Sequence, residues 1–359
     1  MLALAGCGGS GHHRVFVVGA VEDAAKWSPD PDRQMRLAKE SGFQAVALSA
    51  VWSSGASAEQ ALPPLRQAVQ AAVAEGVEPV LAVYQISSST PNDAASRSAF
   101  ASFAAALARA LPDVHRVIVG NEPNLNRFWL PQFGPQGTDV AAWSFERLLA
   151  QTYDALKDVD SDLQVIGGGL APHGGDRPGG SRPTHSPTRF LLDLGRAYRA
   201  SGRDRPLMDA LSVHVYGESP RIPPTLAHPK TTSIGIADYD ELVSLLGRAF
   251  DGTGQEGPKL PIVYGEYGVE TAIPPAKQDL YTGREVVDAV SEQTQAQYYS
   301  TAIRLAACQP TVEMLLLFHV SDESRLDGLQ SGVRYADGSP KQSLPAVRRA
   351  IARGCPRSS

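Results

Sequence analysis

The stretch "RVIVGNEPN", residues 116–124, carries an apolar run directly into Asn121, Glu122 and Pro123. Seven comparable runs of apolar or β-branched residues recur along the chain, beginning at Arg14, Phe43, Val77, Leu163, Asp209, Leu260 and Val312. Most of them lack regular polar alternation, which is typical of strands that are covered on both faces. The runs are therefore predicted to form a parallel sheet.

Helical patterns lie between these runs. Ala142, Phe145 and Leu149 step by three and four residues, and Pro31 and Gly42 mark the start and end of an earlier helix. Eight strand-then-helix units in 359 residues favour an α/β fold of the (β/α)8 type, a single-domain TIM barrel. We expect this barrel to span residues 14–355.

A doubly wound parallel sheet is the main alternative fold. It would require a phosphate-binding glycine turn after the first strand, and "VVGAVEDAAKW", residues 17–27, has no G-x-G-x-x-G pattern. The glycine run 167–169 follows the fifth strand without the rest of that fingerprint. It is predicted to form a tight turn.

A TIM barrel places function on the loops that follow the carboxyl ends of its strands. Strand four ends at Asn121-Glu122 and strand seven at Glu266, and period-two alternation puts His214 and Tyr216 on one face of strand six. The loops after strands five, six and seven are long and rich in Pro and Gly, as functional loops often are. A single glutamate at a strand end is often only solvated, but two on nearly opposite strands favour a functional pair.

Three of these motifs resemble those of a known family. "GNEPN" at 120–124, "HVYG" at 214–217 and "YGEYG" at 264–268 look like the strand four, six and seven motifs of clan A glycoside hydrolases, which include cellulase-like, β-xylosidase-like and arabinofuranosidase-like enzymes. "LQSGVRYADGSPKQS" at 329–343 is similar to a segment of cellulase-like bacterial hydrolases. The resemblance spans about residues 14–353. It implies a (β/α)8 barrel and retaining hydrolysis, with Glu122 as acid/base and Glu266 as nucleophile.

The sequence departs from that family at three places. Many members carry Arg after strand two, His after strand three and Trp after strand eight, where this chain has Ser49 and Trp52, Tyr84 and Gln85, and Phe318-His319. The resemblance therefore supports the assignment of the catalytic pair better than the assignment of any sugar-binding subsite.

The two glutamates suit hydrolysis of a glycosidic bond. Glu122 would protonate the leaving oxygen while Glu266 attacks the sugar carbon, with hydrogen bonds from His214 and Tyr216 favouring its ionised form. Asn121 is expected to hold a sugar hydroxyl, such as the 2-OH. Side chains expected to contact substrate also include Trp52, Tyr84, Trp129, Tyr267 and His319, with Trp27 and Tyr281 nearby. Ordinary packing under a loop is the alternative for each aromatic residue.

Composition narrows the range of partners. The net charge is −5 and no long basic run is present, so nucleic acid is not expected as a partner. No cofactor or metal is expected, since the strand ends lack a His/Asp cluster, His12-His13 is too short a motif, and His173 and His185 lack partners at ligand spacing. A metal-dependent barrel hydrolase is therefore disfavoured.

The N-terminus "MLALAGC", residues 1–7, resembles a bacterial lipobox with Cys7 as the lipidated residue. The apolar part is shorter than a complete signal peptide, so residues 1–13 are interpreted either as the remnant of a lipoprotein signal and a flexible tether, or as a chance match. The first interpretation predicts an exported, monomeric, cell-surface protein with a lipid anchor. An exported protein could join Cys308 and Cys355 in a disulfide, and two half-buried thiols are the alternative.

Two functions follow from these observations. The first is a retaining glycoside hydrolase that cleaves O-glycosidic bonds in plant or microbial oligo- or polysaccharides, with β-linked glycans preferred and arabinofuranosides the other option. The second is a surface carbohydrate-binding lipoprotein that has lost catalysis on the same barrel. The presence of both Glu122 and Glu266 favours the enzyme.

Overall fold

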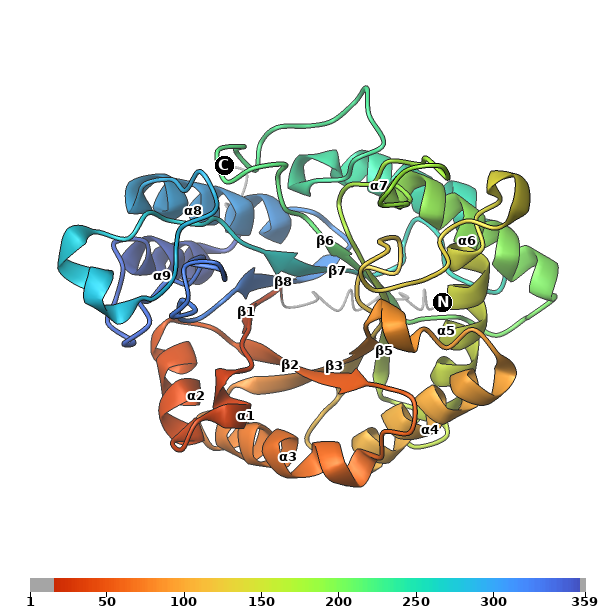
Figure 1. Ribbon diagram of the computed structural model, residues 1–359, viewed down its shortest axis with the longest axis horizontal. Coiled ribbons are helices and arrows are strands. Elements are labelled where there is room, and N and C mark those ends of the chain that lie inside the picture. The colour runs from red at the N-terminus through yellow and green to blue at the C-terminus, as the bar shows by residue number, and fades with distance from the viewer. Residues whose placement is uncertain (1–15, 356–359) are drawn as a thin grey trace, which may run out of the picture.

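The computed structural model describes residues 16–355 and contains a closed barrel of eight parallel strands (Figure 1). Each strand pairs with the next along the chain, and β8 returns to pair with β1. The strands are β1 (Val17–Val21), β2 (Ala45–Trp52), β3 (Glu78–Gln85), β4 (Arg116–Val119), β5 (Gln164–Leu170), β6 (Ala210–His214), β7 (Ile262–Tyr267) and β8 (Val312–Phe318). The predicted TIM barrel is confirmed. The lipobox residue Cys7 and the His12-His13 pair lie outside the described residues.

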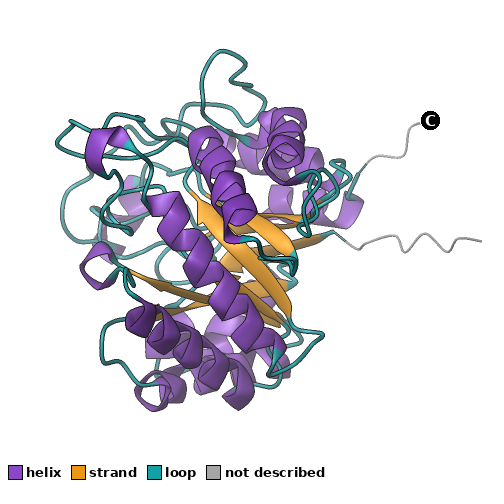
Figure 2. Cartoon of the chain, turned by 90° about the vertical axis from the view of Figure 1, so that its right-hand side faces the viewer, coloured by secondary structure: helices purple, strands orange, loops and turns teal. Residues whose placement is uncertain are grey.

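Helices surround this barrel, and long loops extend from one end of the strands (Figure 2). The α-helices are α1 (Ala24–Trp27), α2 (Pro31–Glu40), α3 (Ala58–Ala74), α4 (Ala94–Ala110), α5 (Ala141–Lys157), α6 (Pro187–Ser201), α7 (Tyr239–Phe250), α8 (Glu292–Ala307) and α9 (Leu344–Arg353). The short 3-10 turns are η1 (Ser87–Ser89), η2 (Pro135–Gly137), η3 (Ile236–Asp238) and η4 (Pro275–Leu280). Over residues 16–355, none of the helices combines the length and the apolarity needed to cross a membrane.

The start of α2 shows how local sequence sets an element. The Asp30 carboxylate accepts a hydrogen bond of 2.9 Å from the Arg33 amide, and Pro31 occupies the first helical position. After the helix, Gly42 adopts a left-handed backbone with φ of +92°. The predicted start and end of this helix are therefore confirmed.

The core has an inner and an outer part. Inside the barrel, one buried cluster draws residues from every strand, namely Val17, Ala45, Ala47, Val80, Ile118, Ile166, Ala210, Val263, Met314 and Leu316. Neighbouring residues of opposite parity, such as Tyr264 beside Val263, instead pack in the larger cluster between strands and helices. The inner cluster fills the barrel interior, so an open site can form only at the strand ends.

The glycine run of β5 differs from its prediction as a tight turn. Gly167, Gly168 and Gly169 lie inside the strand, where the register with β6 shifts between Gly168 and Leu170. Gly168 and Gly169 have φ of +105° and +62°, and a Cβ on Gly168 would lie 2.8 Å from the Ser212 carbonyl oxygen. The run is therefore a bulge that requires glycine.

The loops after β7 and β8 are joined by a buried lysine. Lys341 donates 2.7 Å hydrogen bonds to Asp322 Oδ1 and Thr271 Oγ1 and a 3.0 Å bond to the Gln330 carbonyl. Both Lys341 and Asp322 are fully buried at their side chains. The contacts of Lys341 with Thr271 and Asp322 fix the loop after β7 to the loop after β8. Removing Lys341 or Asp322 would leave an uncompensated buried charge.

Cys308 and Cys355 form a disulfide with their Cα atoms 4.9 Å apart. The bond ties the end of α8 to the residues after α9. Of the two alternatives for these cysteines, the structure therefore supports the paired one.

Candidate active site

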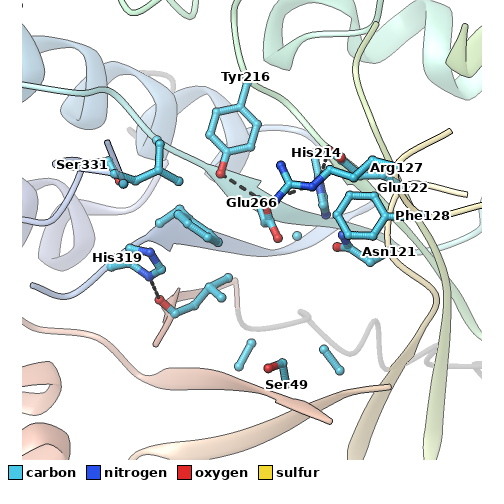
Figure 3. Close-up of a pocket in the computed structure, with 18 of the residues that line it drawn as sticks. Ser49, Asn121, Glu122, Arg127, Phe128, His214, Tyr216, Glu266, His319 and Ser331 are labelled. Carbon is cyan, nitrogen blue, oxygen red and sulfur yellow. Dashed lines mark hydrogen bonds and ion pairs between the residues drawn. The ribbon is translucent and has the colours of Figure 1, made fainter. Parts of the chain in front are cut away.

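A cavity of about 970 Å³ opens at the carboxyl ends of the strands. Its walls include seven of the side chains predicted from the sequence, namely Tyr84, Asn121, Glu122, His214, Tyr216, Glu266 and His319. Figure 3 labels all of these except Tyr84. They come from β3, β4, β6, β7, β8 and the residues that directly follow these strands. The barrel thus gathers residues that are up to 235 positions apart, as Tyr84 and His319 are.

The backbone at Glu122 explains how a strand can end in a carboxylate that faces the cavity. β4 ends at Val119, and Glu122 adopts a left-handed conformation with φ of 41°. Its amide donates a 2.7 Å hydrogen bond to the carbonyl of Gly169 in the β5 bulge. A left-handed non-glycine residue costs free energy, and such residues persist where the surroundings hold them and often serve function.

The second asparagine of the GNEPN motif has a structural role that sequence reasoning missed. Asn124 is fully buried, and its amide group donates to the carbonyls of Ala171 and His185 at 3.1 and 3.0 Å. Its Oδ1 accepts a 2.9 Å bond from the Ala171 amide. Asn124 therefore clamps the loop that carries Glu122 onto the loop after β5.

His214 joins the two glutamates. Its Nδ1 lies 3.1 Å from Glu122 Oε1 and 3.5 Å from Glu266 Oε2. Burial opposes a charged imidazole, but the carboxylates of Glu266 and Glu122 raise the pKa of His214 above its ordinary value. An imidazolium at this position attracts both carboxylates and sets their relative placement.

Glu266 is held by a hydrogen bond from Tyr216. The Tyr216 hydroxyl donates a 3.1 Å hydrogen bond to Glu266 Oε2 (Figure 3). Burial and the adjacent carboxylates raise the pKa of Tyr216 well above its ordinary value, so the hydroxyl keeps its proton. Burial also raises the pKa of Glu266, and His214 and Tyr216 act against that rise. The charge of His214, which hydrogen-bonds to Glu122 rather than to Glu266, and the hydrogen bond from Tyr216 therefore favour an ionised Glu266.

His319 lies on the β8 side of the cavity. Its Nδ1 is 2.9 Å from the Val21 carbonyl oxygen and its Nε2 is 3.6 Å from Glu323 Oε1. Burial alone would lower the pKa of His319, but Glu323, Glu22 and that carbonyl together raise it to about 9. His319 is therefore protonated at neutral pH, on the β8 side of the cavity that holds the glutamate pair.

This raised pKa predicts a pH-dependent contribution of His319 to stability. The folded pKa of about 9 lies above the ordinary value of 6.5, so the contribution is full below about pH 6.5 and disappears as pH rises through about 9. We expect wild type to lose up to about 3 kcal/mol more than His319→Gln between pH 6 and pH 9.5. Urea unfolding at the two pH values measures this difference. The same loss in both proteins would contradict the prediction.

Two predicted aromatic contacts are wrong because both side chains face the helices rather than the cavity. Trp52 is 2% exposed and packs edge-on against Phe100 of α4, with ring centroids 5.6 Å apart. Tyr267 is also 2% exposed and packs against Tyr299 of α8 at 5.8 Å. Val51 before Trp52 faces the cavity, so period two turns Trp52 outward, toward the helices. In β7 the alternation itself is interrupted: the register with β8 shifts between Tyr264 and Tyr267, and both of these side chains pack outward while Glu266 faces the cavity.

Trp129 is a third wrong prediction, with a different cause. After Glu122 the chain turns, and the Trp129 amide donates a 3.0 Å hydrogen bond to the Leu125 carbonyl. This turn buries Trp129 completely against Phe145, 5.5 Å away. Phe128 lines the cavity instead and meets the ring of Tyr84 edge-on at 6.2 Å.

The other aromatic candidates also lie away from the cavity walls. Trp27 is 74% exposed outside the cavity. Tyr281 is buried, and its hydroxyl donates a 2.7 Å bond to Asp322. Conversely, the cavity includes Asp23 and Ser49, near the ends of β1 and β2, which sequence reasoning did not assign to substrate. Over residues 16–355, no group of three or more His, Cys, Asp or Glu side chains is arranged to hold a metal ion.

No protein-family model matches the sequence, and no curated protein sequence matches it. Solved structures do share the fold. A GH5_18 protein from Streptomyces cattleya, in complex with GlcNAc, is 15% identical over 96% of this chain and 82% of its own, with a TM-score of 0.62. A monomeric β-xylosidase from Caulobacter crescentus is 16% identical over 94% of this chain and 67% of its own, with a TM-score of 0.59.

A GH2 β-galacturonidase from Eisenbergiella tayi is 12% identical with a TM-score of 0.58, and the match covers 94% of this chain. This chain spans about half the length of that protein, 51%. The structural neighbours are thus glycoside hydrolases with a TIM-barrel core. At these identities they establish the fold that the motif resemblance implied, and they do not establish a substrate.

Proposed function

We propose that this chain is a retaining glycoside hydrolase that cleaves β-linked O-glycosidic bonds in plant or microbial oligo- or polysaccharides by double displacement. The observation that carries the proposal is the contact of Glu122 and Glu266 with one imidazole nitrogen of His214. The Glu122 Oε1 and Glu266 Oε2 atoms lie 3.1 and 3.5 Å from that nitrogen. The distance between these two carboxylate oxygens therefore cannot exceed the sum of the two distances. This favours the spacing of about 5–5.5 Å in retaining enzymes over about 6.5–9.5 Å in inverting ones.

In the first step Glu122 donates a proton to the leaving oxygen, and Glu266 attacks the anomeric carbon to form a glycosyl ester. His214 and Tyr216 hold the Glu266 carboxylate for this attack. In the second step Glu122 removes a proton from water, which displaces Glu266. Asn121, at the cavity wall beside Glu122, is proposed to hold the sugar 2-OH.

The preference for β-linked substrate draws on the neighbours. A Glu-to-Ala variant of the Streptomyces cattleya GH5_18 protein is known in complex with Manb1-4GlcNAc. A non-catalytic carbohydrate-binding protein remains the second proposal, because the same cavity could hold a sugar without cleaving it. The left-handed Glu122 favours the enzyme, since a binding protein has no need to hold a carboxylate in a costly conformation.

Stereochemistry tests the proposal. Double displacement by Glu122 and Glu266 predicts that the first-formed sugar keeps the anomeric configuration of the substrate. Proton NMR of early product from an aryl glycoside, recorded before mutarotation, measures that configuration. Inverted product would rule out double displacement, and a sugar bound but never cleaved across an aryl glycoside panel would favour the binding protein.

Export is also proposed, with lipid attachment at Cys7 and a monomeric state. The Cys308–Cys355 disulfide supports export, since such bonds persist mainly in oxidising compartments.

A further inference from the structure

Among the other carboxylates that line the cavity, Asp23 stands out by its fixed hydrogen bonds. Asp23 follows β1 and lines the cavity together with Ser49 of β2. The Asp23 Oδ1 accepts a 2.8 Å hydrogen bond from the Ser49 amide, and Oδ2 accepts one from the Ser49 hydroxyl. The two strands therefore hold this carboxylate in a defined orientation.

A buried lysine completes this cluster. Lys26 is 9% exposed, and its Nζ lies 2.9 Å from Asp23 Oδ1. The same nitrogen donates to the Ser49 carbonyl at 2.6 Å and to its hydroxyl at 2.9 Å. Because a buried ammonium requires a counter-charge, Lys26 holds the Asp23 carboxylate beside it.

Asp23 retains the capacity to accept a further hydrogen bond. A carboxylate offers about four acceptor positions on its two oxygens. Oδ1 accepts from Lys26 and the Ser49 amide, whereas Oδ2 accepts only from the Ser49 hydroxyl among the described residues. The Asp23 side chain is 36% exposed, and it lines the cavity. Oδ2 is therefore available to a donor that enters the cavity.

The position of this cluster indicates which part of a substrate reaches it. Figure 3 shows Ser49 on the far side of the open space from Glu266 and Tyr216. A sugar ring attacked by Glu266 would lie in that space, with its leaving group directed to Glu122 and the neighbouring Phe128. Its ring hydroxyls are then the donors nearest to Asp23.

We infer that Asp23 accepts a hydrogen bond from a hydroxyl group of the sugar ring in the proposed hydrolysis, and so selects rings that carry a hydroxyl there rather than an anionic group. The inference rests on the proposed function. Lys26 and Ser49 act as positioning residues, because their contacts hold Asp23 in one orientation. A uronate carboxylate at the same place would face a fixed negative charge and have no proton to donate.

Monodeoxy substrates test this contact directly. On the 4-nitrophenyl glycoside that wild type hydrolyses best, Asp23→Asn should lower kcat/KM about 10- to 100-fold, the usual effect of losing a hydrogen bond to a charged group. For wild type, kcat/KM on one monodeoxy version of that glycoside should fall by a similar factor, which we call the deoxy penalty. For Asp23→Asn, kcat/KM on the monodeoxy glycoside should be at most twofold below its value on the parent glycoside. A merely structural role would leave the deoxy penalty unchanged in the variant.

Asp30→Asn is the matched control. Asp30 is the residue just before α2, as Asp23 is the residue just before α1. Unlike Asp23, Asp30 does not line the cavity. This variant should keep both the activity and the deoxy penalty of wild type. If Asp23→Asn does not fold, Asp23→Glu keeps the charge beside Lys26 while moving the carboxylate, and it should also lose the deoxy penalty.

The outcomes separate this inference from the proposed function. If wild type is active and every monodeoxy penalty is the same in the folded Asp23 variant, the inference is wrong and the hydrolase proposal stands. If wild type cleaves no glycoside, the proposed function fails and the inference fails with it.

Discussion

The Glu266→Ala variant is expected to lose about 10⁴- to 10⁶-fold of kcat, the scale seen when an enzyme loses its nucleophile. Good leaving groups should not restore activity, because the missing step is the attack itself. Azide can enter the space vacated by the carboxylate beside Tyr216 and His214. It should then attack the sugar once, giving a glycosyl azide of inverted configuration.

Initial rates on aryl glycosides and NMR of the azide product measure both effects. Thermal melts must first show that the variant folds, since Glu266 neutralises part of the charge around His214. Wild-type activity in a folded Glu266→Ala protein would show that this residue is not the nucleophile.

The Glu122→Ala variant should respond to the leaving group. Glycosides with good leaving groups need little protonation, so they should still form the intermediate on Glu266 and release a burst of phenol. Poor leaving groups should lose about 10²- to 10⁴-fold in rate, the usual contribution of a general acid. Turnover of the intermediate should be slow for both kinds of substrate, because Glu122 is also the base.

Azide provides the complementary observation for Glu122→Ala. It needs no base, so it should restore turnover and give a glycosyl azide of retained configuration. Inverted azide product from this variant would mean that the roles of Glu122 and Glu266 are exchanged. Rates that are equally low for good and poor leaving groups would show that Glu122 is not the acid.

The sequence was sufficient for the features that depend on period and order. Eight apolar runs alternating with helical patterns predict the closed barrel, and parity predicts that His214 and Tyr216 share a face. The same parity rule, applied to the residues after Ser49, would have excluded Trp52 from the cavity, so that error was avoidable. It would not have excluded Tyr267, because the register of β7 with β8 shifts between Tyr264 and Tyr267.

Other features depend on contacts that no local pattern encodes. The hydrogen-bonded turn after Glu122 decides that Phe128 rather than Trp129 meets the cavity. The bulge in β5 depends on a register shift against β6. Asp23 becomes a site candidate only because β1 and β2 bring it to Ser49, 26 residues away.

Trapping the glycosyl-enzyme is the most direct test of the catalytic pair. A 2-deoxy-2-fluoro glycoside with a good leaving group, carrying the sugar that wild type accepts, slows hydrolysis of the intermediate more than its formation. Peptide mass spectrometry then locates the sugar ester. Double displacement predicts one ester per chain, on the peptide that contains Glu266. An ester on Glu122, or inactivation without any covalent sugar, would contradict the assignment of Glu266 as the nucleophile.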